Sequence, residues 1–275
     1  MEVQQSPLYA QYIKRLKWNA EKLDGHYVYL KHFPVLGTIA KLQRCEALPN
    51  VKKTVTFLQE HKVTSFAPEP SANVDQSSFS SWIKKVSPHT RINRSHFLPT
   101  RTILINLNKS EDTLFQNFSE AKRRGVRRAQ KLGVSVQKSD DIRAMLSVKS
   151  RSAGPFGFMV VSAIPQLWET FAPNHTAILL AHHPSSPHPI GGILLLLWNN
   201  RAYYWLVGAT KQGKKLFAPT LLVWEALKLS KKRGMKEFDF LGVNDERLPK
   251  DNPSWRGFTK FKEEFGGKPL YYPYY

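Results

Sequence analysis

Apolar residues recur along this chain with two periods, one typical of strands and one typical of helices. Short apolar runs bounded by glycine, proline or asparagine predict strands, and apolar residues at steps of three and four predict helices. The polar, serine-rich residues 70–81 are typical of a surface loop. In the first part of the chain the pattern predicts a helix over 7–17, a hairpin over 26–44, a helix over 50–62 and strands over 63–67 and 99–107.

The clearest amphipathic pattern covers residues 110–133 and predicts one long helix. Ser110 suits the N-cap, and Gly133 suits the left-handed residue that ends a helix. The apolar stripe consists of Leu114, Phe118, Ala121, Gly125, Ala129 and Leu132. The second half of the segment carries the cations Lys122, Arg123, Arg124, Arg127, Arg128 and Lys131. Two interpretations stay open, a solvated face whose cations suit the helix C-terminus and a binding site for polyphosphate or nucleic acid.

The second half of the chain restarts with a strand over 134–137 and a helix over 140–151. A segment rich in glycine and proline follows at 154–165, and Pro165 begins another helix. The remaining pattern predicts strands over 176–181, 190–198 and 202–209, a helix over 219–233, a strand over 237–241, a loop over 242–256, a helix over 258–265 and a terminal strand over 271–275. This order predicts an α/β protein with mixed sheets and resembles the GNAT acyltransferase fold.

Composition and charge narrow the class of protein. Of the 275 residues, 41% are hydrophobic and 12% are aromatic, which are values of a folded globular protein. The 41 Lys and Arg against 21 Asp and Glu give a net charge of +20, and both halves of the chain are basic. This excess suits an anionic partner, which can be nucleic acid, a phosphorylated precursor or an acidic membrane surface.

Cysteine and histidine usage excludes several kinds of site. Cys45 is the one cysteine, so an intrachain disulfide, an iron–sulfur cluster or a cysteine-based zinc site cannot form within the chain. His182, His183 and His188 lack the spacing of a metal site, and we expect neither a metal nor a cofactor. The first residues lack the apolar core of a signal peptide, and the longest apolar run, 193–198, is too short to span a bilayer. We expect a cytoplasmic protein and leave open a peripheral contact with the inner face of the membrane.

Three sequence patches point to one family. The first is PTRTILINL followed by the basic helix, with Arg123, Val126, Arg127, Ala129 and Gly133. The second is RAYYWLVGAT, a helix and then EFDFLGV, and the third is GFTKFKEEFGG. Together they resemble the FemABX family of aminoacyl-tRNA-dependent transferases, which build the interpeptide bridges of peptidoglycan. Weaker similarity at SPLYAQYIKRLKW and FPVLG extends the resemblance over nearly the whole chain.

The resemblance implies two GNAT-like domains in tandem. We expect them to cover 1–132 and 133–267, with a C-terminal strand at 268–275 that returns to the first domain. The long helical arm of some members does not fit the second domain, so the sequence resembles the arm-less form. The implied activity moves an amino acid from aminoacyl-tRNA to an amine of a peptidoglycan precursor, which can be UDP-linked or lipid-linked. The amino acid, the acceptor and the oligomeric state stay open.

The chain departs from the family pattern at three places. Arg124 and Gly125 stand where members tend to have Tyr-Asn, and residues 42–45 replace a substrate strand rich in proline and glycine. Members that bind a UDP-linked precursor place an arginine just before the helix that begins near Pro165, and residues 158–164 contain none. The identity of the acceptor is therefore open even within the family.

The implied reaction determines which residue types the site needs. It requires a neutral amine, a stabilised oxyanion, a protonated leaving hydroxyl and two large anions held together. The sequence has no GxSxG motif for a covalent nucleophile, so direct attack is the economical mechanism.

Lys262 and Asp239 are the candidate catalytic residues. The resemblance implies that Lys262 lies near the tRNA terminus or the developing negative charge, and the alternative is a solvent-facing lysine on a short helix. Strand alternation puts Asp239 on the face opposite to Phe238 and Phe240, where it can orient an amine or hold a catalytic group.

Lys22, Tyr204 and Arg201 are the candidate substrate-binding residues. Lys22 has the spacing from Trp18 of the family's lysine for precursor phosphates, with a solvated lysine as the alternative. Tyr204 fits the family position better than Tyr203, which points to the other face of the strand, and cross-strand packing is the alternative for both. For tRNA the candidates are Arg123, Arg127 and Lys131 on one face of the basic helix, with Lys214 and Lys215.

Two other functions stay open. An acyl-CoA N-acyltransferase of the GNAT type would hold pyrophosphate on a Gln/Arg-x-x-Gly-x-Gly/Ala turn before a helix N-terminus. The equivalent residues 211–219, KQGKKLFAP, have one misplaced glycine and a proline, which disfavours coenzyme A. A non-enzymatic nucleic-acid-binding protein is favoured by charge alone, because most aromatic residues lie in apolar strands rather than among basic residues.

Overall fold

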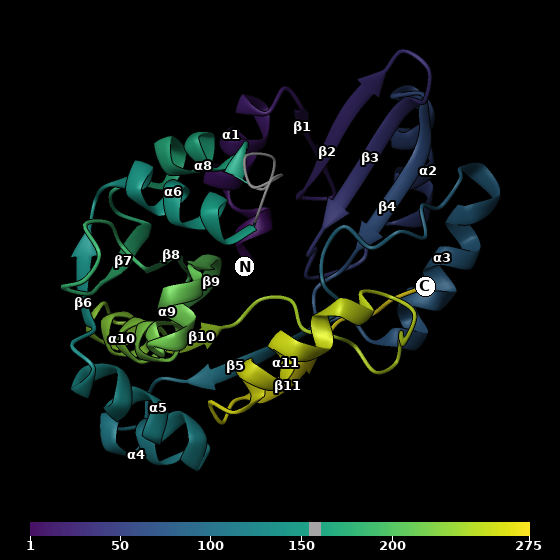
Figure 1. Cartoon of the computed structure of the whole chain (residues 1–275). Helices are drawn as coiled ribbons and strands as arrows, with labels where there is room; N and C mark the ends of the chain where they lie inside the picture. Colours follow the sequence, from purple (N-terminus) through teal and green to yellow (C-terminus); the bar gives the residue numbers. More distant parts are fainter. Residues whose placement is uncertain (154–160) are drawn as a thin grey trace. The chain divides into compact units, whose positions relative to one another are not determined.

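The chain forms two compact units, one of Met1–Thr102 with Leu270–Tyr275 and one of Ile103–Pro269. The computed structural model describes residues 1–153 and 161–275 (Figure 1). The division seen here differs from the expected boundary after Leu132, because the basic helical segment packs with the core of the second unit. Each unit has its own sheet and its own hydrophobic core.

The first unit is built on a four-stranded sheet of order β1-β2-β3-β4. The first two pairings are antiparallel, and β3 pairs with β4 in parallel. Its core includes Leu30, Leu42, Phe66 and Phe79. Its elements are η1 (Val3–Gln5), α1 (Pro7–Arg15), β1 (Asn19–Leu23), β2 (His26–Phe33), β3 (Gly37–Gln43), α2 (Val51–Glu60), β4 (Val63–Glu69), α3 (Gln76–Val86) and η2 (Ser87–His89).

The C-terminal residues Leu270–Tyr275 belong to the first unit, where they contact Arg44, Gln76 and Thr100. The ring of Tyr272 stacks on the guanidinium of Arg44, whose carbon lies 3.4 Å from the ring centroid, and the Tyr272 N–H donates to the carbonyl of Thr100 at 2.8 Å. The Gln76 side chain exchanges two hydrogen bonds with the backbone of Tyr274, at 2.7 and 3.0 Å. The prediction of a terminal strand over 271–275 is wrong, because the last strand, β11, covers Lys268–Tyr271.

The second unit contains a seven-stranded sheet of order β11-β5-β10-β9-β8-β7-β6. β6 to β9 form an antiparallel meander, and β10 runs parallel to β9 and antiparallel to β5. Its elements are β5 (Arg101–Asn106), α4 (Glu111–Gln116), α5 (Glu120–Lys131), β6 (Ser135–Ser139), α6 (Ile142–Ala153), α8 (Ile164–Phe171), β7 (Thr176–His182), β8 (Gly191–Trp198), β9 (Arg201–Ala209), α9 (Lys211–Lys215), α10 (Ala218–Lys232), β10 (Glu237–Asp239), η4 (Pro253–Trp255), α11 (Arg256–Glu263) and β11.

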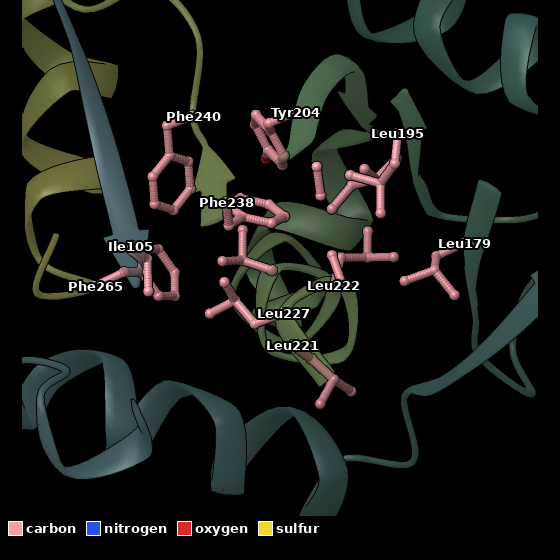
Figure 2. Packing of buried hydrophobic residues seen from close by; sticks show 14 of the residues in the cluster. Ile105, Leu179, Leu195, Tyr204, Leu221, Leu222, Leu227, Phe238, Phe240 and Phe265 are labelled. Carbon is pink, nitrogen blue, oxygen red and sulfur yellow. The ribbon is translucent and has the colours of Figure 1, made fainter. Parts of the chain in front are cut away.

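Helices cover both faces of the central strands, which explains why β7 and β8 are mostly apolar and are buried along nearly their whole length. A Cβ at Gly191 would lie 2.9 Å from Leu222 of α10, and one at Gly192 would lie 2.7 Å from the sulfur of Met145 in α6. The two glycines therefore let both helices approach the sheet closely. Figure 2 shows the α10 side of this core, where Leu222 lies with side chains from the strands.

The single helix expected over 110–132 is two helices, α4 and α5. Ser119 begins α5 as its N-cap and accepts the N–H of Lys122 at 3.3 Å. The guanidinium of Arg123 donates to the carbonyls of Gln116 and Phe118, both at 2.8 Å, and thereby stabilises the break. The expected apolar stripe is confirmed for Leu114, Phe118, Gly125 and Ala129, but Ala121 and Leu132 are exposed and Val126 is buried instead.

One α-helix and one strand of the first unit were not predicted. α3 begins inside the expected loop over 70–81, because Asp75 caps it by accepting the N–H groups of Ser77 and Ser78. β1 pairs with β2 in a hairpin whose turn contains Gly25. Part of the glycine- and proline-rich segment, residues 154–160, lies outside the described residues. Across the described ranges, no helix has both the length and the apolar character to cross a bilayer.

Candidate active site

The two central strands of the second unit separate at their carboxyl ends. β9 and β10 pair in parallel as far as the partners Tyr203 and Asp239, where β10 ends while β9 continues to Ala209. The chain then turns through Leu241 and Gly242, whose φ angles are 49° and 22°. In open α/β sheets, ligands bind outside the carboxyl ends of central strands.

Lys262 of α11 directs its amine into this turn. Its Nζ donates to three successive carbonyl oxygens, those of Phe240, Leu241 and Gly242, at 2.9, 2.7 and 2.7 Å. The left-handed backbone of the turn lets these carbonyls converge on one donor. The Lys262 side chain is only 9% exposed, so the alternative of a solvent-facing lysine is wrong.

Burial lowers the pKa of Lys262 to about 7, against the opposing effect of the Asp239 carboxylate, which raises it. An ammonium removed from water loses hydration, and that loss favours the neutral amine. A lysine with a pKa lowered toward neutrality by burial is typical of groups that take part in a reaction.

Asp239 is buried and connects the turn with the beginning of β9. Its Oδ1 accepts the N–H of Leu241 at 2.7 Å, and its Oδ2 lies 3.9 Å from the guanidinium of Arg201. Arg201 also donates to Oε2 of Glu237 from Nε at 2.9 Å and from Nη2 at 2.8 Å. Asp239 therefore fixes the turn that holds Lys262, and its negative charge favours the ammonium form.

Tyr204 lies on the core side of the same turn (Figure 2). Its ring centroid is 6.0 Å from that of Phe238 and 5.5 Å from that of Phe240. The Nζ of Lys262 lies 5.8 Å from the Tyr204 ring centroid. Burial raises the pKa of the Tyr204 hydroxyl, so the phenol is neutral at physiological pH. The ring of Tyr204 packs in the core, as the alternative of cross-strand packing predicts, and Tyr203 is buried as well.

Several residues that shape this site had no signal in the sequence. Thr259 of α11 accepts the N–H of Asn244 and donates to the carbonyl of Trp255, both at 2.8 Å. Arg247 forms an ion pair with the buried Asp245 at 2.7 Å. The Thr259 contact attaches the loop after β10 to α11, and the ion pair lies within that loop. The carbonyls that hold Lys262 belong to the backbone, which residue identity does not reveal.

A second feature, the cationic groove, runs along α5 and has a volume of about 630 Å³. Phe217 lies at the N-cap of α10 with a left-handed φ of 59°, and its ring centroid is 5.0 Å from the guanidinium carbon of Arg128. A Cβ at Gly125 would lie 3.2 Å from Thr220, so this glycine lets α5 approach α10. The groove is lined by Ala121, Arg124, Gly125, Arg127, Arg128, Lys131 and Phe217.

The groove modifies the candidate tRNA-binding set. Arg127 and Lys131 line it as expected of one helix face, whereas Arg123 is directed to the carbonyls at the α4–α5 break. Arg124 and Arg128, from the neighbouring face, line the groove instead. Arg124 also pairs with Glu120 at 2.9 Å, an exposed contact that contributes little to stability.

The turn before α10 uses its amides internally. The N–H groups of Gly213, Lys214, Leu216 and Phe217 donate to oxygen atoms within the turn at 3.0 to 3.2 Å. A Cβ at Gly213 would lie 2.2 Å from the carbonyl oxygen of Ile190, so this glycine packs against the chain beside β8. These four amides are therefore not available to a pyrophosphate.

The remaining candidate residues lie on α9 and on β1. Lys214 and Lys215 are exposed on α9. Lys22 lies on β1 of the first unit, where its Nζ donates to the carbonyl of Gly25 at 3.1 Å and sits 3.5 Å from the ring centroid of Tyr27. Within residues 1–153 and 161–275, no three His, Cys, Asp or Glu side chains gather as a metal site. Of the stretch 158–164, residues 158–160 lie outside the described residues.

Comparisons with known proteins agree on the fold. Residues 116–250 match the family model of the GNAT acetyltransferase domain. No curated protein matches the chain by sequence. The crystal structure of FemX superposes with a TM-score of 0.74 and 13% identity, over 98% of this chain and 90% of FemX.

Two further solved structures show the same arrangement. L-PGS from Bacillus licheniformis has a TM-score of 0.61 and 11% identity, over 98% of this chain and 86% of that chain. A tandem GNAT protein from the clavulanic acid biosynthesis pathway has a TM-score of 0.57 and 12% identity, over 91% and 78%. The chain therefore has a FemX-like fold with two GNAT-like domains, which is an acyltransferase fold.

Proposed function

We propose that this protein is an aminoacyltransferase that moves an amino acid from aminoacyl-tRNA to an amine of a peptidoglycan precursor. The observation that carries the proposal is Lys262, a buried amine held by three carbonyls where the central strands of an acyltransferase fold separate. The FemX-like fold and the family resemblance of the sequence support the choice of donor and acceptor.

The proposed reaction is direct attack of the acceptor amine on the ester carbonyl of the charged tRNA. The amine nitrogen forms the new amide bond, the ester oxygen leaves with the terminal ribose as a hydroxyl, and the proton of the amine goes to that hydroxyl. Cys45 is excluded as a nucleophile, because it is fully buried and burial raises the pKa of its thiol to about 12.

In this mechanism the Lys262 ammonium stabilises the negative charge that develops on the ester oxygens. A fixed positive charge in a site with little water is worth more than the same charge in solution. Asp239 acts as a positioning residue, since it holds the turn at Leu241 through its 2.7 Å hydrogen bond. Arg201 and Tyr204 complete the surroundings of this turn, and their contact with the acceptor is part of the proposal.

The cationic groove supplies a surface for the tRNA. Arg124, Arg127, Arg128 and Lys131 offer four cations to phosphates, and Phe217 offers an aromatic ring to a base or a ribose. Exposed Lys214 and Lys215 extend the same charge along α9.

The acceptor is proposed from the family resemblance, with Lys22 as its phosphate contact in the first unit. The exposed Nζ of Lys22 is held only by one carbonyl and one ring among its described contacts, so a phosphate can compete for it. A UDP-linked and a lipid-linked precursor both carry such phosphates. A cytoplasmic location follows from this choice of substrates and is part of the proposal.

An acyl-CoA N-acyltransferase is the second candidate, favoured by the match to the GNAT acetyltransferase domain. The turn before α10 argues against it, since Gly213, Lys214, Leu216 and Phe217 donate their amides internally. A purely nucleic-acid-binding role leaves the buried amine of Lys262 without a purpose. The aminoacyl-tRNA donor accounts for both the amine and the groove.

Reversing two charges of the groove should weaken tRNA binding. We expect Arg127→Glu with Arg128→Glu to raise the Kd for tRNA by about tenfold or more at moderate salt, because two phosphate contacts are lost. The slope of log Kd against log salt should fall by about two. Filter binding over a series of salt concentrations measures both quantities.

The matched control is Lys84→Glu with Lys85→Glu, which changes the net charge equally at the exposed end of α3. This control should bind tRNA with nearly wild-type affinity. Equal weakening in both variants would assign the effect to net charge, and an unchanged affinity in the groove variant would make the α5 cations a solvated face.

A further inference from the structure

The hairpin between β2 and β3 ends in an exposed apolar tip. Val35 is 94% exposed and Leu36 is 65% exposed, and Pro34 before them is exposed as well. Contiguous aliphatic side chains at such exposure are unfavourable in water unless they serve a contact. This apolar tip, Pro34–Leu36, lies in the first unit and has no part in the chemistry proposed above.

The apolar tip is presented by a fixed backbone. The hydroxyl of Thr64 on β4 shares its one proton between two carbonyl oxygens, that of Leu36 at 2.8 Å and that of Thr38 at 3.1 Å. Gly37 has a φ of 76°, and a Cβ there would lie 2.5 Å from Thr64, so only glycine lets β4 approach the turn this closely. The hairpin therefore holds Val35 and Leu36 outward without a need for ordering on contact.

Aromatic and cationic side chains lie directly behind the apolar tip. The rings of Phe33 and Trp18 are 6.4 Å apart, and the Nζ of Lys31 lies 5.6 Å from both ring centroids. The same Nζ lies 3.5 Å from the carbonyl of Leu16 at the end of α1. Aromatic rings with lysines beside them are the composition of a membrane interface, with the charges at the headgroups.

The segments around the apolar tip are basic. β4 begins at Val63, which pairs with Thr38 beside the apolar tip. The segments 13–18, 31–38 and 61–64 contain no Asp or Glu. The nearest acidic residue in sequence to the last segment is Glu60, at the end of α2. Their charged side chains are Lys14, Arg15, Lys17, Lys31 and Lys62, of which all but the half-buried Lys31 are exposed. This basic belt matches an anionic surface.

We infer that the apolar tip docks the first unit on an anionic lipid bilayer, with Val35 and Leu36 in the acyl boundary and the basic belt at the headgroups. A second protein is a poorer occupant, because three side chains cannot bury the roughly 800 Å² per partner of a stable interface. Nucleic acid is a poorer occupant as well, because aliphatic side chains offer no ring for base stacking. The inference does not depend on the proposed transfer reaction.

The chain offers a clean test, because its one cysteine, Cys45, is fully buried. Val35→Cys in the full chain can be labelled with a polarity-sensitive fluorophore at a single site. We expect its emission to shift to shorter wavelength with vesicles of phosphatidylglycerol and phosphatidylcholine, and to stay unchanged with phosphatidylcholine alone. Leu132→Cys, labelled at an exposed leucine outside the apolar tip, is the control and should show no shift with either vesicle.

A second pair of variants separates insertion from charge attraction. Val35→Asp with Leu36→Asp should weaken sedimentation with the anionic vesicles by about tenfold or more, since two apolar side chains no longer enter the bilayer. Leu132→Asp with Gln130→Asp changes the net charge equally at two other exposed positions and should sediment like the wild type. Melting curves of both variants verify that they fold.

Three results would overturn the inference. The first is a labelled Val35→Cys protein whose emission does not respond to anionic vesicles. The second is sedimentation that the aspartates at the tip leave unchanged, which would assign membrane binding to net charge alone. The third is self-association of the free protein that the same aspartates abolish, which would make a second copy the occupant.

Discussion

Replacing Lys262 by methionine should lower the turnover of aminoacyl transfer by about a hundredfold or more, the scale of losing one oxyanion donor. Methionine keeps the length of the side chain and removes its charge and donors. If the ammonium bound only tRNA phosphates, the KM for tRNA would rise while turnover at saturation survived. Steady-state kinetics with charged tRNA separates the two effects.

The same substitution should also reduce stability, in contrast to what a surface lysine would predict. Lys262→Met leaves the carbonyls of Phe240, Leu241 and Gly242 without this donor, and we expect a loss of about 1–3 kcal/mol. Lys260→Met is the matched control, because Lys260 is exposed on the same helix. Normal transfer in Lys262→Met, or equal losses in the control, would remove Lys262 from the reaction.

The pH dependence of Lys262 has a definite sign. Its pKa in the folded protein is lowered from 10.5 to about 7, so the unfolded chain binds more protons between these values. Stability of the wild type relative to Lys262→Met should therefore rise as the pH increases from 7 toward 10.5. Turnover should fall above pH 7 as the ammonium loses its proton, and Lys262→Met should lack that decline.

Tyr272→Ala should destabilise the first unit by about 3 kcal/mol or more, the cost of removing a large buried ring. The ring is 4% exposed and covers the guanidinium of Arg44, which is itself buried. The substitution leaves a cavity beside a buried charge, so both effects act in the same direction. Urea unfolding of the full chain measures the change.

Tyr274→Ala is the control for the loss of stability expected from Tyr272→Ala. Tyr274 is half-buried, and its hydrogen bonds to Gln76 use backbone atoms. A much smaller loss is expected there. If Tyr272→Ala unfolded at the urea concentration of the wild type, the C-terminal residues would not support the first unit.

The sequence predicted most elements because their signals are local. The apolar runs of β8 and β9, with Asn199 and Asn200 between them, identify a hairpin without tertiary information. The start of α5 at Ser119 was missed, because the apolar spacing continues across the break and the stabilising contact of Arg123 is with backbone carbonyls. α3 was missed because serine-rich composition outweighed the capping residue Asp75.

The sequence predicted the parts of the candidate site that depend on side-chain identity, and it did not predict the parts that depend on backbone geometry. Sequence patches singled out Lys262 and Asp239 as candidates, and both contact the turn at Leu241 in the structure. Strand alternation predicted that Asp239 faces away from Phe238 and Phe240, which pack in the core. The burial of Lys262 was not predicted, since it depends on a left-handed turn that brings three carbonyls to one point. Phe217 was not predicted either, because the groove exists only where α5 meets α10. The spacing of cations along α5 cannot predict a groove that is formed by α5 and α10 together.

A transfer assay with competing donors can decide whether the protein uses aminoacyl-tRNA or acetyl-CoA. The protein would be incubated with total charged tRNA and acetyl-CoA together, in the presence of UDP-linked and lipid-linked peptidoglycan precursors, and the precursors would be examined by mass spectrometry. We expect a precursor to gain the mass of an amino acid residue, and ribonuclease treatment of the tRNA to abolish the gain. An acetylated precursor, or no gain from charged tRNA, would contradict it.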